Sequence, residues 1–174
     1  MRYKKILKRK IIFCGRLIKL HLEKHRFPDG YIADLEVITH PGAVLIIPFL
    51  QRNRIILIKQ YRPVINSYIL ELPAGTLKKN ETPLKCAKRE MLEEIGYRAS
   101  RWKRLGYIYP APGYTTEKIL IFAAEGLKKV KSSEEEDELI APEIFTRKEV
   151  RQLLKSGGLV DAKTICALKF TDVL

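Results

Sequence analysis

Short apolar stretches bounded by turn residues predict β-strands in the first half of the chain. Residues 31–38 alternate between apolar and polar positions as a half-buried strand does, and His-Pro-Gly at 40–42 ends the pattern. Residues 43–50 and 55–61 are two mostly apolar runs separated by four polar residues, which predicts a hairpin of buried strands. Further strands are expected near residues 68–72, 102–109 and 117–124.

Residues 83–95 change to the period of an α-helix. The apolar residues fall within an arc of about 80° at 100° per residue, which predicts one buried stripe. Thr82 is suited to cap the amino end, Pro83 to the first turn, and Gly96 to the stop. The residues of the stripe are Leu84, Ala87, Met91 and Ile95.

Two further helices are predicted near the carboxyl end. Thr146 and Glu149 have the form of a capping box ahead of a helix that ends at residues 157–158. Asp161 is suited to cap a last helix that continues through Phe170. Strands mixed with three helices in 174 residues indicate a single domain of the α/β or α+β class, with a small appendage at most.

The positive charge of the chain is concentrated at its amino end. The formal net charge is +13, and residues 1–26 hold ten Lys or Arg against one acidic residue, whereas the remainder holds 23 basic and 19 acidic residues. Such a segment can attract nucleic acid, an anionic surface or a phosphorylated substrate. No RNA-reading motif or interleaved aromatic residues accompany the charge, so we expect a solvated, frayed arm and no nucleic-acid partner.

Apolar run length and cysteine use bear on the compartment. No apolar stretch reaches the roughly 18 residues that a membrane-spanning helix needs, so we expect no membrane association. Cys14, Cys86 and Cys166 are far apart and form no CxxC pair, which predicts neither a disulfide framework nor a zinc site. A reducing cytoplasm fits this cysteine use.

Three glutamates lie on one face of the predicted helix. Glu90, Glu93 and Glu94 are spaced i, i+3 and i+4, directly beside the apolar stripe. Arg89 points elsewhere on the helical wheel, and we expect that it cannot neutralise all three. The cluster therefore costs stability unless a cation binds there, and Mg²⁺ or Mn²⁺ prefers such oxygen ligands and shares them with substrate phosphates. A solvated acidic face is the alternative interpretation.

The residues around the three glutamates decide between these interpretations. The pattern is Gly75, five residues, Glu81, seven residues, Arg89-Glu90, two residues, Glu93-Glu94, one residue and Gly96. It resembles the signature of the Nudix hydrolases, which forms a loop, a helix and a second loop. The resemblance implies a Nudix-type α/β/α sandwich with a mixed sheet and a small N-terminal antiparallel sheet. We therefore expect residues 1–40 to form an arm and small sheet used for dimerisation, and residues 41–174 to form the catalytic domain.

The same resemblance implies roles for individual residues. The metal ligands that it implies are the side chains of Glu90, Glu93 and Glu94 and the backbone carbonyl of Ala74. Glu93 matches a position that binds metal or polarises water. Arg89 and Glu81 match a pair that braces the loop against the helix. The family hydrolyses a nucleoside diphosphate linked to another group, using Mg²⁺ or Mn²⁺.

Segments outside the signature resemble the ADP-ribose pyrophosphatase branch of the family. They are QYR at 60–62, LELPAG at 70–75, YPAPG at 109–113 and DAKTI at 161–165. We therefore expect hydrolysis of ADP-ribose to AMP and ribose 5-phosphate by a homodimer. The substrate-binding residues that the resemblance implies are Arg62, Glu71, Pro112 and Glu117.

Other substrates and another class of function stay open. GDP-mannose or another nucleoside diphosphate sugar is one alternative, and Tyr114 occupies a place where dinucleoside polyphosphate hydrolases carry a tyrosine. A nucleic-acid-binding module that uses the basic arm is an alternative of a different class.

The reaction also needs a general base. Residues 134–138 form the only dense acidic run of the chain, and relatives place a catalytic glutamate in a comparable segment. Counting back from Thr146, Glu136 fits best and Glu138 second, with Glu93 as the further candidate.

Overall fold

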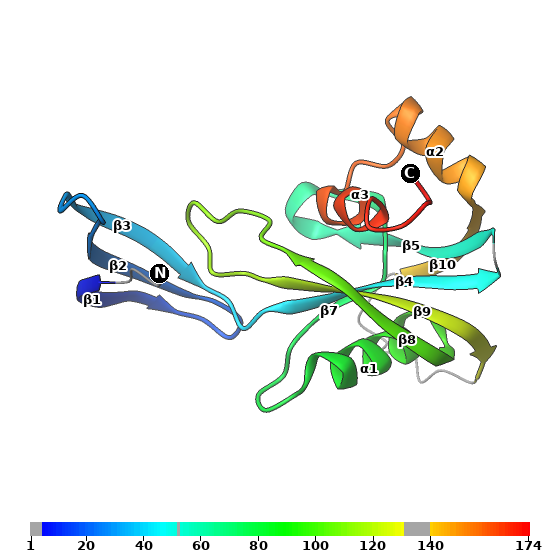
Figure 1. The fold of residues 1–174 in the computed structure, drawn as a ribbon, viewed down its shortest axis with the longest axis horizontal. Coiled ribbons are helices and arrows are strands. Elements are labelled where there is room, and N and C mark those ends of the chain that lie inside the picture. Colours follow the sequence, from blue (N-terminus) through cyan, green and yellow to red (C-terminus); the bar gives the residue numbers. More distant parts are fainter. Residues whose placement is uncertain (1–4, 52, 131–139) are drawn as a thin grey trace. The chain divides into compact units, whose positions relative to one another are not determined.

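The structure is a computed structural model that describes residues 5–51, 53–130 and 140–174 (Figure 1). The chain divides into two compact units, Met1–Gly42 with Tyr109–Lys118, and Ala43–Ile108 with Ile119–Leu174. The boundary expected at residue 40 places residues 109–118 in the catalytic domain, whereas in the structure they belong to the first unit. Each unit has its own sheet.

The first unit contains an antiparallel sheet in the order β1-β2-β3. Its strands are β1 (Lys5–Cys14), β2 (Lys19–Arg26) and β3 (Ile32–Thr39). The expectation of a frayed basic arm is therefore wrong for residues 5–26. One reason is an acidic anchor: Glu23 on β2 is only 2% exposed, and its carboxylate lies 2.6 Å from both Arg9 Nε on β1 and His25 Nε2.

The second unit is built on a mixed sheet in the order β10-β5-β4-β9-β8, with β6 paired to β5 and β7 paired to β4. Among the described strands of this sheet, only the β4–β9 pair is parallel. The strands are β4 (Ala43–Gln51), β5 (Arg54–Arg62), β6 (Ser67–Glu71), β7 (Ala74–Thr76), β8 (Tyr97–Ile108), β9 (Ile119–Lys129) and β10 (Ile140–Thr146). A 3-10 turn, Pro63–Ile65, joins β5 to β6. The sequence did not predict β10, and β8 and β9 extend further than expected because they continue to pair with each other as far as Tyr97 and Lys129.

The helices begin at the capping residues that the sequence predicted. In α1 (Pro83–Ile95) the Thr82 hydroxyl accepts from the Lys85 N–H, and Gly96 ends the helix with a φ of 69°. A capping box between Thr146 and Glu149 starts α2 (Arg147–Ser156), and Asp161 caps α3 (Ala162–Leu168), which ends two residues before Phe170. Among the residues described, no helix is long and apolar enough to cross a membrane.

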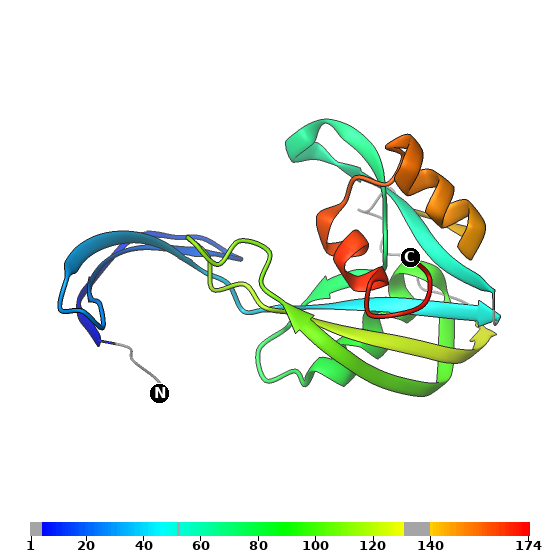
Figure 2. The same cartoon turned by 45° about the horizontal axis from the view of Figure 1, so that its top comes forward.

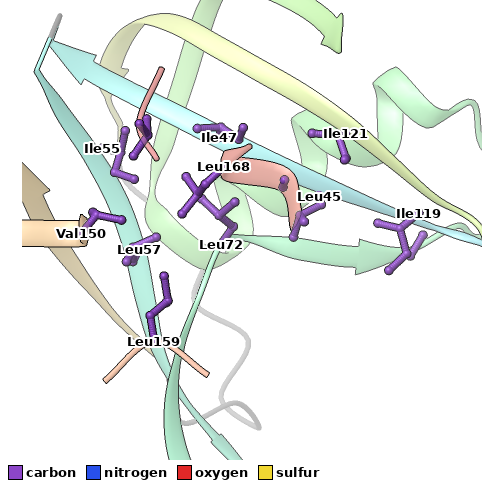
Figure 3. Close-up of a cluster of buried hydrophobic side chains, with 13 residues drawn as sticks. Leu45, Ile47, Ile55, Leu57, Leu72, Ile119, Ile121, Val150, Leu159 and Leu168 are labelled. Carbon is purple, nitrogen blue, oxygen red and sulfur yellow. The ribbon is translucent and has the colours of Figure 1, made fainter. Parts of the chain in front are cut away.

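Helices cover both faces of the second sheet (Figures 1 and 2). Successive residues of β4 and β5 face opposite ways, so the apolar runs divide between two cores. Leu45 and Leu57 pack with residues of α2 and α3, including Leu168 (Figure 3). Ile46 and Met91 belong to the other core, which α1 covers. The α/β/α sandwich with a mixed sheet is confirmed.

Candidate active site

Strand β7 and helix α1 meet at the residues of the signature. A Cβ atom added to Gly75 would lie 1.8 Å from Glu90 Oε1, so only a residue without a side chain leaves room for the Glu90 carboxylate. One residue earlier, the Ala74 N–H donates to Glu94 Oε2 at 2.9 Å. The backbone of β7 therefore fixes the positions of two glutamates of α1.

Arg89 lies among the carboxylates of this site. Its Nη1 is 2.6 Å from Glu90 Oε1 and 2.8 Å from Glu93 Oε2. The expectation that Arg89 points elsewhere is wrong, because a helical wheel gives the direction of Cβ and the long arginine side chain reaches back to neighbouring positions. Arg89 pairs with two of the three glutamates, and the Ala74 N–H binds the third, Glu94.

Arg89 also fastens the loop before α1. Its Nε and Nη2 donate to the two carboxylate oxygens of Glu81 at 2.9 and 3.0 Å, which is the brace that the signature implied. These hydrogen bonds lower the pKa of Glu81 from its usual 4.5 to about 2. Burial raises the pKa of the nearby Cys86 thiol to about 12, so this thiol is protonated at neutral pH and is not a thiolate nucleophile.

The donors at this site fit a hard divalent cation chemically. Glu90, Glu93 and Glu94 supply carboxylate oxygens, and Gly75 leaves space that a side chain would fill. Within the ranges that the structure describes, no three acidic, histidine or cysteine side chains are grouped closely enough to hold a metal ion. In this arrangement Arg89 and the Ala74 N–H bind carboxylate oxygens that could otherwise face a metal ion.

A second charged cluster lies at the end of β6. Glu71 is fully buried, and its carboxylate accepts from Arg62 Nε and Nη2 at 2.6 and 2.7 Å and from Lys163 Nζ. Asp161 Oδ1 lies 3.0 Å from the same Lys163 Nζ. Burial by itself raises the pKa of Glu71, but the hydrogen bonds from Arg62 and the charge of Lys163 outweigh burial and lower it. The carboxylate therefore stays ionised.

The two clusters interact through Arg62. Hydrogen bonding to Glu71 is the main cause that raises the pKa of Arg62, and the negative charges of Asp161 and Glu94 raise it further. The Arg62 side chain is 40% exposed. Its guanidinium therefore joins a buried carboxylate to a solvent-facing position within electrostatic range of Glu94.

Sequence reasoning assigned no role in the site to Lys163 and Thr164, although it noted the DAKTI segment and the Asp161 cap. Lys163 binds Glu71, and the Thr164 hydroxyl accepts from the Leu72 N–H at 2.8 Å. The available signal was that LELPAG and DAKTI both resemble one branch of the family, which is consistent with the two segments being in contact.

Of the remaining predicted residues, two belong to the first unit and two lie outside the described residues. Pro112 and Glu117 belong to the first unit, where Glu117 Oε1 lies 3.9 Å from His40 Nδ1. Glu136 and Glu138 lie outside the described residues.

Comparison with known proteins is consistent with this geometry. Residues 39–168 match the NUDIX domain family. The chain belongs to this family. Nudix hydrolases in general use divalent metal ions, and the chain is a Nudix pyrophosphohydrolase, as the signature predicted.

Two relatives and one solved structure cover almost the whole chain. The "Methanol dehydrogenase activator" of Bacillus methanolicus and the "ADP-ribose pyrophosphatase" of Bacillus subtilis (strain 168) are each 34% identical over 171 residues, 97% of this chain and 92% of the relative. The structure described as "Crystal structure of ADP compounds hydrolase" has a TM-score of 0.83 and 25% identity, covering 98% of this chain and 92% of that one.

The Glu81–Arg89 brace makes a pH-dependent contribution to folding. The pKa of Glu81 is lower in the folded state. The brace therefore makes its full contribution to the stability of the fold above about pH 4.5, and this contribution is lost as the pH falls towards about 2. We expect Glu81→Gln to lower the free energy of unfolding by about 1–2 kcal/mol at pH 7, and by progressively less below pH 4.5. Urea denaturation between pH 7 and pH 3 measures this difference.

The matched control for this measurement is Glu125→Gln, which breaks the exposed Arg101–Glu125 pair at 3.2 Å. We expect a change of less than about 0.5 kcal/mol there. A Glu81→Gln effect that stays constant with pH would contradict the assignment.

Space at Gly75 gives a second prediction. Gly75→Ala places a methyl group where the Glu90 carboxylate lies, so we expect kcat/KM to fall about a hundredfold because an expected metal ligand is displaced. Gly158→Ala is the control, since its nearest contact would be the end of the Leu153 side chain at 3.0 Å. Steady-state kinetics with thermal unfolding of both variants makes the comparison, and wild-type kinetics in Gly75→Ala would refute the prediction.

Proposed function

We propose that this chain hydrolyses the pyrophosphate bond of ADP-ribose to give AMP and ribose 5-phosphate, with Mg²⁺ as the metal and Mn²⁺ as a substitute. The observation that carries the proposal is the complete signature on β7 and α1, in a chain of which 97% aligns with a relative named ADP-ribose pyrophosphatase. The signature accounts for the chemistry, and the aligned length supports the choice of substrate.

The residues that would hold the metal are Glu90, Glu93 and Glu94, with the backbone carbonyl of Ala74. When bound, a divalent ion neutralises diphosphate charge and lowers the pKa of a bound water. The chain itself keeps these donors in place. Arg89 holds Glu90 and Glu93, and the Ala74 N–H orients Glu94.

We assign the diphosphate contact to Arg62. A guanidinium binds phosphate oxygens with its planar set of N–H donors, and Arg62 uses Nε and Nη2 for Glu71 while the side chain stays 40% exposed. Glu71 was expected to bind substrate, but it is fully buried. We therefore give Glu71 the role of orienting Arg62. Pro112 and Glu117 remain candidates for substrate contact on the sequence resemblance alone.

The general base is proposed from sequence, because Glu136 and Glu138 lie outside the described residues. Glu136 is the first choice, Glu138 the second and Glu93 the third. We expect Glu136→Gln to lower kcat by orders of magnitude with little change in metal affinity, because the loss concerns a proton and not a ligand. Steady-state kinetics beside Mn²⁺ binding measures both quantities, and unchanged turnover would move the base to Glu138 or Glu93.

We propose that the protein acts as a homodimer through its first unit. Three strands are close to the minimum for a stable sheet, and several large apolar side chains on these strands are exposed. They are Leu7, Ile11, Ile12, Phe13, Leu22 and Ile32. Pairing with a second copy would remove them from water, and a monomer mass by light scattering at micromolar concentration would refute the proposal.

We place the enzyme in the cytoplasm. Cys14, Cys86 and Cys166 are all free thiols in the structure, which is the usual state of cysteine in a reducing compartment.

One experiment tests the activity, the metal and the substrate together. Purified protein is assayed for products with ADP-ribose, GDP-mannose and capped RNA, with Mg²⁺ and after removal of metal by EDTA. We expect AMP and ribose 5-phosphate from ADP-ribose, no turnover with EDTA, and a loss of at least about a hundredfold in Glu94→Gln, because a metal ligand is removed.

Glu125→Gln is the matched control, because it removes the same charge from an exposed glutamate outside both charged clusters. Preferred turnover of GDP-mannose would reassign the substrate. No turnover of any substrate, together with RNA binding that falls steeply with salt, would favour the nucleic-acid-binding module.

A further inference from the structure

The four-residue segment 71–74 runs between the two charged clusters, and separate parts of the fold hold each of its residues. The Glu71 carboxylate binds Arg62 and Lys163, and the Leu72 N–H donates to Thr164 Oγ1 at 2.8 Å. The Pro73 carbonyl accepts from the Ile46 N–H at 2.9 Å. The Ala74 N–H, finally, donates to Glu94 Oε2.

These contacts connect the two helical layers of the sandwich. Leu72 packs in the core beneath α2 and α3, whereas Glu94 belongs to α1 on the other face of the sheet. A shift of the segment at Leu72 would be passed along two bonded residues to the Ala74 N–H. The segment therefore links the contact that holds Leu72 to the N–H that binds Glu94.

The first turn of α3 supplies that hold with three polar side chains. Asp161 Oδ2 accepts from the Thr164 N–H at 3.0 Å, and its Oδ1 lies 3.0 Å from Lys163 Nζ. The Asp161 carboxylate thus caps α3 and also positions the Lys163 ammonium group, which binds Glu71. Thr164 is fully buried, so the Leu72 N–H would have no water to replace the lost hydroxyl.

We propose that Thr164 and Lys163 are positioning residues for the metal site on the opposite face of the sheet. They hold residues 71–74 in the position in which the Ala74 N–H orients the Glu94 carboxylate. Outer-shell partners of this kind orient a ligating carboxylate, and their loss weakens metal affinity by about ten- to a hundredfold. The inference rests on the proposed function, because it takes Glu94 as a metal ligand.

The test is direct binding of Mn²⁺ to the full chain without substrate. Binding is measured as the decrease of the free Mn²⁺ signal in electron paramagnetic resonance. Thr164→Val keeps the shape of the side chain and removes the hydroxyl, and we expect the Kd for Mn²⁺ to rise about tenfold. Thr164→Ser restores the hydroxyl, and we expect its Kd to stay within about twofold of wild type.

Thr171→Val is the matched control. The Thr171 hydroxyl donates to the Leu168 carbonyl at 2.8 Å at the other end of α3, so its removal perturbs the same helix without touching residues 71–74. We expect a lower melting temperature in Thr171→Val with an unchanged Kd. If Thr164→Val does not fold, Lys163→Met replaces it, since Lys163 is 19% exposed and its loss leaves Glu71 held by Arg62 alone.

Glu94→Gln distinguishes a failure of the proposed metal site from a failure of the positioning role. If wild type and Glu94→Gln bind Mn²⁺ equally, the metal site of the proposed function is wrong. If Glu94→Gln binds more weakly while folded Thr164→Val or Lys163→Met binds as wild type does, the metal site stands and the positioning role is wrong. Weaker binding in Thr171→Val to the same extent as in Thr164→Val would also overturn it, because the effect would then be general to α3.

Discussion

Glu90, Glu93 and Glu94 repel one another across little more than one turn of α1, and the neighbouring residues are arranged to tolerate that repulsion. Arg89 pairs with two of the carboxylates, and a backbone N–H binds the third. A peptide N–H carries only a partial charge, and Arg89 is shared with Glu81, so the site keeps an excess of negative charge. A site of this kind favours a divalent cation and, through it, a diphosphate.

The second cluster gives the Arg62 guanidinium a fixed geometry. A buried ion pair adds little net stability, because the cost of removing charges from water offsets their attraction. Its effect here is directional, because two N–H groups of Arg62 donate to a carboxylate that Lys163 also holds. The guanidinium is then set in advance, and under the proposed function this reduces the entropy lost when a diphosphate binds.

The first unit differs from the second, because its described residues bury few apolar side chains. Buried Glu23 and His21 lie on β2, and many large apolar side chains of the unit stay exposed. A sheet with buried polar side chains and exposed apolar ones is better suited to association than to folding alone. This contrast with the second unit, which has an apolar core on each face of its sheet, is consistent with the proposed homodimer.

The sequence by itself determined the local features of this protein. The limits of α1 follow from Thr82 and Gly96, because caps act within one turn of the helix. The spacing of Glu90, Glu93 and Glu94 placed them on one face of the helix, and the pattern that they form with neighbouring residues of the signature identified the family.

Only the tertiary structure decided which charges meet. Glu71 and Lys163 are 92 residues apart, and the position of Arg89 depends on how far a flexible side chain reaches within a packed site. Strand β10 likewise exists because β5 offers it a paired edge. Pattern and spacing encode interactions within a few residues, whereas contacts between distant segments depend on the path of the whole backbone, which no local pattern records.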